Sequence, residues 1–329
     1  MVKIDVKDKK IIVELDLNAR MPLTVLAKKV GLSRQVVEYR IKRMQKEGVI
    51  SGAKTVFDSA VVGFNWYRVI FRLLNVTKKQ KEKFLQYLTN HKNTLWLGEV
   101  GGNWDIAVNF ICKDNFRFNS IFEEIISKQR EYIRDYEILI YVGLQDYERS
   151  YLLRDGKLKV RKYFHHKMRY NHLIKLDGLD KKIITELAKN AFISNLELGK
   201  KLKVTGNTIK NRINEMIKRK LILGFRLFVN PSVLGYKSHM LFLGINNLSL
   251  EKEKELNNYL KLNPNITFVV KQIGRWRIGM EIETKNEEEF QEIFVNIRGK
   301  FSEIITDFET FPIFKDHVVN YFPKGVLDE

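Results

Sequence analysis

The sequence repeats itself at an offset of 172 residues (180 − 8), and this repeat constrains the fold more than any other feature. The segment DKKIIVEL at 8–15 aligns with DKKIITEL at 180–187. The register continues without a gap through Arg40 and Arg212, Gly102 and Gly274, and Trp104 and Trp276. A period of this length far exceeds that of a solenoid repeat, so each copy is large enough to form one or two independent domains.

The first part of each copy has the pattern of three short helices. In the first copy apolar residues recur at helical spacing in three groups: Ile11, Ile12 and Leu15; Leu23 and Leu26; and Val37, Ile41 and Met44. Ser33 and Thr205 are preferred N-cap residues, and Gly31 is a natural left-handed helix terminator. The second copy has Lys203 in place of Gly31, which predicts a cost of about 1 kcal/mol if the left-handed geometry is kept.

The second part of each copy changes to an alternating pattern. It reads as strand FNWYRVIFRLL, helix KKQKEKFLQYLTNH, strands TLWLGEV and WDIAVNFIC, helix NFRFNSIFEEIISK and strand YEILIYVGL. This βαββαβ order is typical of a ferredoxin-like sandwich, in which two helices cover one face of an antiparallel sheet. The other face carries the mixed row Trp66, Arg68, Ile70, Arg72 and Leu74. An open face of this composition requires a partner.

Charge and composition limit the class of function. The chain has 58 Lys and Arg against 39 Asp and Glu, a formal net charge of +19 over 329 residues. Such a field attracts polyanions, although it does not distinguish DNA, RNA and anionic lipid. No apolar run approaches the roughly 20 residues that cross a bilayer, and no signal-peptide core begins the chain. With Cys112 as its only cysteine, the sequence predicts a soluble cytoplasmic protein.

The helical parts carry the side chains of a DNA-binding unit. A second helix that meets a third through a turn at Ser33 is the arrangement of helix-turn-helix proteins, whose recognition helix enters the major groove. The candidate base and phosphate contacts are Ser33, Arg34, Gln35, Glu38, Tyr39, Arg40, Lys42 and Arg43 in the first copy, and Lys200, Lys201, Thr205, Asn207, Thr208, Lys210, Asn211 and Arg212 in the second. Ordinary solvated helix faces are the alternative. The repeated order and the net charge favour DNA binding.

Three segments carry a resemblance to a known family: residues 8–52, which read DKKIIVELDLNARMPLTVLAKKVGLSRQVVEYRIKRMQKEGVISG, and the later strings FDSAVVG and GGNWD. They resemble the Lrp/AsnC family of feast-famine transcription regulators. The likeness covers residues 5 to about 148 and, more loosely, 177 to about 322. The second copy departs from it where Phe192 replaces Arg20, Lys220 replaces Gly48 and Arg277 replaces Asp105.

The resemblance implies an α+β fold with two winged helix-turn-helix domains alternating with two ferredoxin-like βαββαβ domains. The expected boundaries are 1–60 and 176–232 for the winged helix-turn-helix domains, 61–148 and 233–322 for the ferredoxin-like sensing and oligomerisation domains, and 149–175 for a basic linker. In this linker Asp155-Gly156 predicts a hairpin or a loosely ordered tether.

The resemblance also implies an effector site. In such proteins a small molecule, often an amino acid, lies near the loop that matches Gly101, Gly102, Asn103, Trp104 and Asp105. Glycine lets backbone amides approach a carboxylate, and Asp105 could hold an ammonium group. The alternative is a tight β-turn closed by a core tryptophan.

A duplicated chain can pair its own two sheet faces, either as an intramolecular pseudo-dimer or as a homodimer. The linker is long enough to let the first copy meet the second. Arg68 and Arg72 lie on the open side in the first copy, whereas Glu281 and Glu283 alternate away from the apolar row of the second. Opposite charges favour the pairing of unlike copies.

Other functions are supported more weakly. Siroheme decarboxylases resemble the same architecture, and AKTVFDSAVVGF is similar to their matching stretch, but TLWLGEVGGNWDIAVNF lacks the histidines and arginines expected around a carboxylated tetrapyrrole. An architectural nucleoid-associated protein is a third possibility. We expect no catalytic residues, no cofactor and no metal: His165, His166 and His172 have no clustered carboxylate or cysteine beside them, and Cys112 reads as a core residue.

Overall fold

The computed structural model describes residues 2–153, 161–168 and 172–328, so the expected Asp155-Gly156 hairpin lies outside the described residues. The first copy consists of α1 (Val6–Asp16), α2 (Leu23–Val30), α3 (Arg34–Lys46), β1 (Ile50–Phe57), η1 (Ser59–Val62), β2 (Asn65–Leu73), α4 (Lys78–Asn90), β3 (Thr94–Val100), β4 (Ile106–Cys112), α5 (Asn115–Gln129) and β5 (Ile133–Tyr147). The connection contains η2 (Ser150–Leu153) and β6 (Tyr163–His166). The second copy consists of α6 (Gly178–Lys189), α7 (Asn195–Leu202), α8 (Gly206–Lys218), β7 (Ile222–Val229), η3 (Ser232–Leu234), β8 (Lys237–Ile245), α9 (Leu250–Leu262), β9 (Ile266–Ile273), β10 (Ile278–Thr284), α10 (Glu287–Lys300), β11 (Ile305–Val319) and α11 (Gly325–Asp328).

This order confirms the predicted α+β fold of three helices followed by a βαββαβ unit in each copy. The predicted helix caps are also confirmed. Ser33 and Thr205 accept hydrogen bonds from backbone N–H groups of the first turns of α3 and α8, and Gly31 ends α2 with a φ of 66°. Lys203 keeps this left-handed geometry with a φ of 59°, so the predicted strain of about 1 kcal/mol applies to it.

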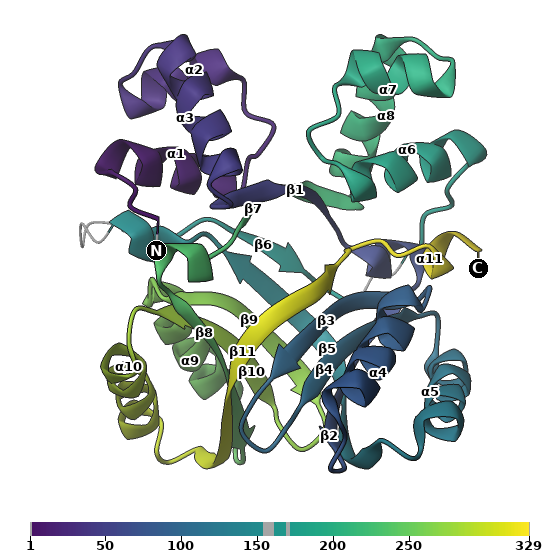
Figure 1. Cartoon of the computed structure of the whole chain (residues 1–329), viewed down its shortest axis with the longest axis vertical. Coiled ribbons are helices and arrows are strands. Elements are labelled where there is room, and N and C mark those ends of the chain that lie inside the picture. The colour runs from purple at the N-terminus through teal and green to yellow at the C-terminus, as the bar shows by residue number, and fades with distance from the viewer. Residues whose placement is uncertain (1, 154–160, 169–171, 329) are drawn as a thin grey trace.

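The two helix-turn-helix units form separate lobes that share one β-ribbon (Figure 1). The strand after each recognition helix pairs with its counterpart from the other copy, β1 with β7, in antiparallel register. Arg20 reinforces this junction, since its guanidinium donates to the carbonyl of Ile193 at 3.1 Å and to the side chain of Asn195 at 2.8 Å. The ribbon therefore fixes the two lobes relative to each other.

Below the lobes, eight strands close into a ring. The pairing order is β2-β4-β3-β11-β8-β10-β9-β5, and β5 pairs in turn with β2, while β6 adds to β5 outside the ring. The two long strands make the closure possible. The first half of β5 pairs with β2 of its own copy and its second half with β9, and β11 likewise passes from β8 to β3. Closure removes the exposed edges that either sheet would present alone.

Apolar residues fill both faces of the ring. Outside it, Tyr67, Val69 and Phe71 pack under α4 and α5, as the alternation predicts. Inside it, Ile70 of the first copy belongs to one buried cluster with Phe242 and Phe311 of the second. Cys112 is fully buried among the outer group, which confirms that it is a core residue. Each sheet thus covers the face that the other would leave open.

The charged residues predicted on the open sheet faces have different partners in the structure. Arg68 lies inside the ring, where its Nε donates to Asn109 Oδ1 at 2.8 Å and its guanidinium lies 5.8 Å from the centroid of the Phe242 ring. Burial lowers the pKa of Arg68, and the charge of Glu281 opposes that shift. Glu283 lies instead against Arg149, at 3.1 Å. The expected complementarity between the copies therefore reduces to Arg68 and Glu281, and it needs the ionised form of Glu281, whose pKa is raised to about 8.

The connection between the copies is docked onto the ring in its described parts. Arg161 is buried, and its guanidinium donates to five carbonyl groups, those of Lys261, Asn263, Glu148, Pro264 and Ile266. His166 is buried beside Asp146, with 3.2 Å between their side chains. These parts of the linker are therefore packed against the ring, whereas the hairpin or tether predicted at Asp155-Gly156 lies outside the described residues. Within the described segments, no helix is both long and apolar enough to span a bilayer.

Glu281 gives the ring a pH-dependent stability. Burial, followed by the nearby charges of Glu283 and Asp316, raises the pKa of Glu281 from 4.5 to about 8, against the opposing charges of Arg149 and Arg226. Between these values the folded chain holds a proton that the unfolded chain has lost. Stability should therefore fall as the pH rises from about 5 to about 8.

We expect Glu281→Gln to remove this part of the slope and to exceed the parent by about 1–2 kcal/mol at pH 8.5. Each pKa unit corresponds to about 1.4 kcal/mol, and the full shift is discounted because the side chain is only half-buried. Urea unfolding at pH 5.5 and 8.5 measures the effect, with the exposed Glu288→Gln as control. Equal pH slopes for the parent and Glu281→Gln would contradict it.

Candidate nucleic-acid interface

Helix α3 presents one polar face to solvent. The side chains of Arg34, Gln35, Tyr39 and Lys42 are exposed, whereas Val37 and Met44 on the opposite face are fully buried. Lys42 Nζ lies 2.8 Å from Glu38 Oε1, one helical turn away. Because Tyr39 remains 66% exposed, its ring and hydroxyl are available to another molecule. Arginine, glutamine and tyrosine in this arrangement suit the edges and phosphates of a DNA groove.

Arg40 and Arg43, two further candidates, are engaged within the unit. Arg40 Nη1 lies 2.7 Å from Asp5 Oδ2 and 2.8 Å from Asp8 Oδ1. Arg43 also pairs with Asp8, whose carboxylate is almost completely buried. Hydrogen bonds to both aspartates, chiefly that to Asp8, raise the pKa of Arg40. These arginines anchor α3 on α1, and their use as DNA contacts stays a prediction.

Helix α8 carries a different polar face. Asn207, Lys210 and Asn211 are exposed, and Thr208 lies beside the cap residue Thr205, with 2.9 Å between their hydroxyl oxygens. Arg212 repeats the role of Arg40, since its Nη1 lies 2.6 Å from Asp177 Oδ2 and 3.2 Å from Asp180 Oδ1. The two recognition helices therefore offer unlike sets of hydrogen-bonding groups.

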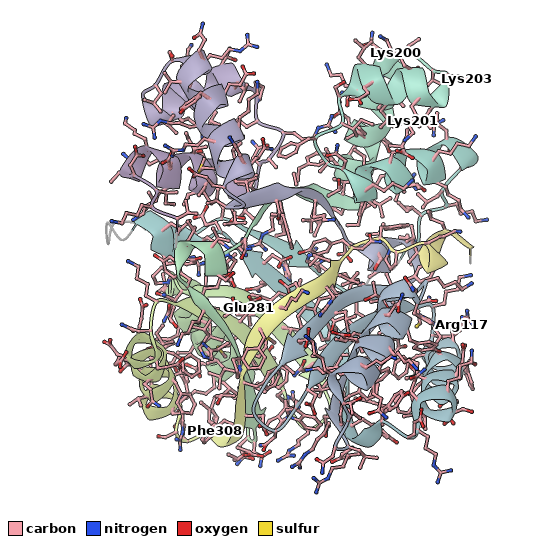
Figure 2. The ribbon with its side chains drawn as sticks, in the orientation of Figure 1. Arg117, Lys200, Lys201, Lys203, Glu281 and Phe308 are labelled. Atoms are coloured by element: carbon pink, nitrogen blue, oxygen red, sulfur yellow. The ribbon has the colours of Figure 1, made fainter. Side chains whose placement is uncertain are left out.

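Lys200 and Lys201 lie in the last turn of α7, at the outer end of the second lobe (Figure 2). Lys201 forms an ion pair with Glu186 of α6, so it also has an internal role. Lys200 is exposed. Lys203, which is not among the predicted DNA contacts, lies in the same region and is exposed as well.

The repeat contains a signal that sequence reasoning overlooked. Asp5, Asp8 and Arg40 recur together at the same offset as Asp177, Asp180 and Arg212. A carboxylate pair that recurs with its arginine indicates an internal ion pair. A second signal for contacts between the lobes is a position at which the two copies differ. Arg20 is replaced by Phe192 in the second copy, and Arg20 donates hydrogen bonds to the other lobe.

The expected effector loop is a turn packed on the second copy. The N–H of Gly101 donates to the carbonyl of Pro312 at 3.1 Å, and the side chain of Asn103 donates to Glu309 at 3.0 Å. Asp105 accepts the backbone N–H of Leu73 at 2.8 Å. Trp104 is buried in the cluster inside the ring, and Gly102 has a φ of 73°, which favours glycine. These contacts are those of a structural turn, and effector binding here stays a prediction.

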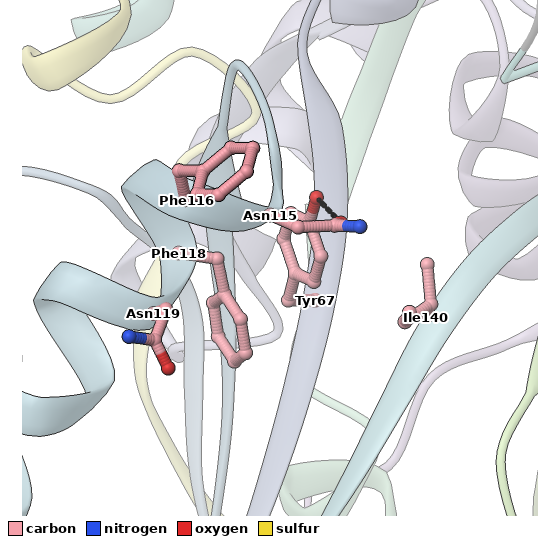
Figure 3. A pocket seen from close by; sticks show the side chains of 6 residues that line it. All are labelled: Tyr67, Asn115, Phe116, Phe118, Asn119 and Ile140. Carbon is pink, nitrogen blue, oxygen red and sulfur yellow. Dashed lines mark hydrogen bonds between the residues drawn. The ribbon is translucent and has the colours of Figure 1, made fainter.

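A cavity of about 450 Å³ lies elsewhere, between the start of α5 and strands β2 and β5 (Figure 3). It is lined by Tyr67, Asn115, Phe116, Phe118, Asn119 and Ile140. The Tyr67 hydroxyl donates to Asn115 Oδ1 at 2.8 Å, and the Tyr67 ring stacks on Phe118. This wall is mainly apolar and aromatic.

The three linker histidines do not converge on a metal site. His165 and His172 are exposed, whereas His166 is buried. Across the described ranges 2–153, 161–168 and 172–328, no group of three or more His, Cys, Asp or Glu side chains could hold a metal ion.

Comparison with known families identifies both helical units. A model described as "Winged helix-turn-helix DNA-binding" matches residues 4–51, and a model described as "AsnC-type helix-turn-helix domain" matches residues 176–217. An uncharacterised HTH-type transcriptional regulator of Pyrococcus abyssi is 31% identical over 126 residues, which are 38% of this chain and 81% of that protein. The proline dehydrogenase transcriptional activator of Rhodobacter capsulatus is 30% identical over 125 residues, again 38% of this chain and 81% of the relative.

Two solved structures of one protein match both copies together. The siroheme decarboxylase NirDL covers 98% of this chain, and this chain covers 97% of it, with a TM-score of 0.61 and 12% sequence identity. At this identity the likeness concerns the fold alone.

Proposed function

Since this chain belongs to the Lrp/AsnC family of transcription regulators, we propose that it binds double-stranded DNA through α3 and α8 and regulates transcription. The observation that carries the proposal is the pair of helix-turn-helix units with unlike exposed residues, joined by the β1–β7 ribbon. The two recognition helices, called readers below, are held at a fixed separation, and this separation defines the spacing of the two half-sites in the DNA. Because the readers differ, the operator should be less symmetric than a simple palindrome.

Genome-wide mapping of the bound DNA, followed by titration of a recovered duplex, tests the proposal. A regulator should bind its operator at least about 1,000-fold more tightly than unrelated DNA at physiological salt. A much smaller ratio would favour an architectural protein that coats DNA without choosing a sequence. No binding to any duplex would overturn both readings.

Arg34→Ala should weaken binding to one half-site by about 1–2 kcal/mol and relax the base preference there, because an arginine fork reads guanine directly. Unrelated DNA should be bound as before. Lys200→Ala is the matched comparison, and it should weaken binding to all sequences and lower the salt slope by about 1. It is preferred to Lys201→Ala because Lys201 already pairs with Glu186. Equal losses on all duplexes for Arg34→Ala would refute its assigned role.

We further propose that the two copies act as each other's partner, so that one chain supplies both readers. The ring closed by β3–β11 and β5–β9 pairing supports this, because it occupies the inner faces and the edges of both sheets. A single chain of 38.9 kDa should then bind one operator, as sedimentation of the free and bound protein can measure. A stoichiometry of two chains per operator would favour a homodimer.

A small-molecule effector at the loop of Gly101 to Asp105 remains part of the proposal. Its backbone amides and the Asp105 carboxylate have the chemistry to hold an amino acid, but that carboxylate already accepts a hydrogen bond from Leu73. Calorimetric titration with the twenty amino acids tests the site. Heat that is lost in Asp105→Asn would support it.

The siroheme decarboxylase reading is the second candidate, and it is raised by the fold that the whole chain shares with NirDL at 12% sequence identity. The segment 94–110 contains no histidine or arginine that would face a carboxylated tetrapyrrole. Incubation of the purified protein with siroheme tests this reading. A Soret band that persists through gel filtration would support the enzyme, and its absence would count against it.

A further inference from the structure

Two lysines of the second copy adopt a backbone conformation that disfavours lysine. Lys203 has a φ of 59° and Lys220 a φ of 64°, both in the left-handed region. The first copy has Gly31 and Gly48 at the matching positions, with φ values of 66° and 73°. Glycine would relieve the strain at either site, because the strain comes from the Cβ atom. A strained residue that a simple substitution would relax is a reason to look for a function.

An internal role for the Lys203 ammonium group is not supported by its contacts. In the first copy Lys7 of α1 neutralises the end of α2, since its Nζ lies 2.6 Å from the carbonyl oxygen of Val30. The second copy has Leu179 at the position of Lys7. Within the described residues, however, Lys203 makes no side-chain hydrogen bond or ion pair, and its side chain is exposed.

The position of Lys203 points to DNA. It lies between the end of α7 and Thr205, the N-cap of α8, at the outer end of the second lobe beside Lys200 (Figure 2). Recognition helices insert their N-terminal ends into the groove, so phosphates flank this end. Lys220 follows the other end of α8, which is 13 residues and about 20 Å long.

We propose that Lys203 contacts a DNA phosphate next to the N-terminal end of α8. The second lobe thereby gains a contact with the DNA phosphate backbone. The first lobe has Gly31 at this position and therefore no side chain that could make the same contact. This inference rests on the proposed function of α8 as a DNA reader. It assigns Lys203 to positioning rather than to base recognition, since a flexible ammonium group binds phosphate as a point charge.

Lys203→Gly and Lys220→Gly form a matched pair that tests the proposal. Both substitutions should raise the Tm by about 1–3 °C, because each removes a strained Cβ atom. Only Lys203→Gly should weaken DNA binding, by about threefold to tenfold at 0.1 M salt, and lower the slope of log Kd against log salt by about 0.9. The affinity should fall equally for the operator and for unrelated duplexes.

Three results would overturn the assignment. Lys203→Gly and Lys220→Gly could have the same affinity and salt slope, Lys203→Gly could lower the Tm, or its loss could be confined to one base pair. Failure of the proposed function looks different, because the unsubstituted chain would then bind no duplex at all. Lys203→Arg serves as the conservative variant, and it should keep the salt slope of the parent.

Discussion

Replacement of Arg149 by methionine is expected to lower the free energy of unfolding by about 3–5 kcal/mol, the range for breaking a buried ion pair by removing one partner. Its guanidinium lies 3.1 Å from Glu283 and 3.3 Å from Asp16. Both carboxylates have side chains that are completely buried, so neither can turn to solvent when the arginine is lost. Methionine keeps most of the side-chain volume, and the effect therefore reports charge rather than a cavity.

The loss of stability should be large because Arg149 belongs to a buried group of charged side chains that come from several parts of the fold. Asp16 ends α1, Glu283 lies on β10, and Arg226 of β7 adds a second cation, 3.3 Å from Asp16 and 3.0 Å from Asp146 of β5. Both lobes and both sheets thus meet in one buried group of charges. Losing Arg149 should loosen the lobes from the ring as well as lower stability.

Equilibrium unfolding in urea, followed by tryptophan fluorescence, measures the change, and the exposed Arg134→Met on β5 is the matched control. Adding Glu283→Leu to Arg149→Met should restore part of the loss, because it removes the buried carboxylate that Arg149→Met leaves without an arginine, whereas Asp16 still has Arg226. A loss below 1 kcal/mol for Arg149→Met would show that solvent enters the junction and compensates the charges.

The elements of each copy could be predicted because their signals are local. Helical spacing at Ile11, Ile12 and Leu15, caps at Ser33 and Thr205, and strict alternation along β2 all depend on neighbours within a few residues. Tertiary packing reinforces these preferences instead of overriding them. The same locality explains why Gly31 and Lys203 could be matched as left-handed positions.

The closed ring could not be predicted in the same way. The segment YEILIYVGL at 136–144 reads as one short strand, but β5 extends over Ile133–Tyr147 because its second half pairs with β9, more than 100 residues away. Alternation fixes which face of a strand is buried and leaves open which edge it joins. Packing of the two inner faces was therefore within reach of sequence reasoning, and the edge pairing was not.

The candidate DNA contacts also fall into two groups, one predictable from local sequence and one that depends on distant residues. Exposure of Arg34, Gln35 and Tyr39 follows from the helical period alone. The engagement of Arg40 by Asp5 and Asp8 depends on residues 35 and 32 positions away. A basic residue on a recognition helix is thus ambiguous until its carboxylate partner is located.

This engagement leads to the second large effect, since Asp8→Ala is expected to cost about 3 kcal/mol. Asp8 is 1% exposed and binds both Arg40 and Arg43, and its carboxylate also accepts the N–H of Asp5 in the capping box of α1. The estimate takes the lower end of the range for breaking a buried ion pair, because both arginines keep partial contact with solvent.

Asp180→Ala in the second copy is the internal comparison. Asp180 has the same capping box but only one arginine partner, Arg212, since Glu215 replaces Arg43 there. Its side chain is also less buried, at 12% exposed, so the cost should be about 1 kcal/mol. Urea unfolding of the two variants measures this difference, and equal costs would contradict the role given to the second arginine.

The same pair of variants separates anchoring from direct DNA contact. Without Asp8, Arg43 loses this partner and Arg40 keeps Asp5, and since both arginines remain cationic, binding to unrelated DNA should stay the same or strengthen. Base recognition by α3 should decline, because the helix loses its two ion pairs with Asp8 of α1. The ratio of operator to unrelated affinity should therefore fall for Asp8→Ala by about tenfold, the equivalent of one base contact. An unchanged ratio would mean that the hydrophobic contacts of Val37 and Met44 alone hold the recognition helix in place.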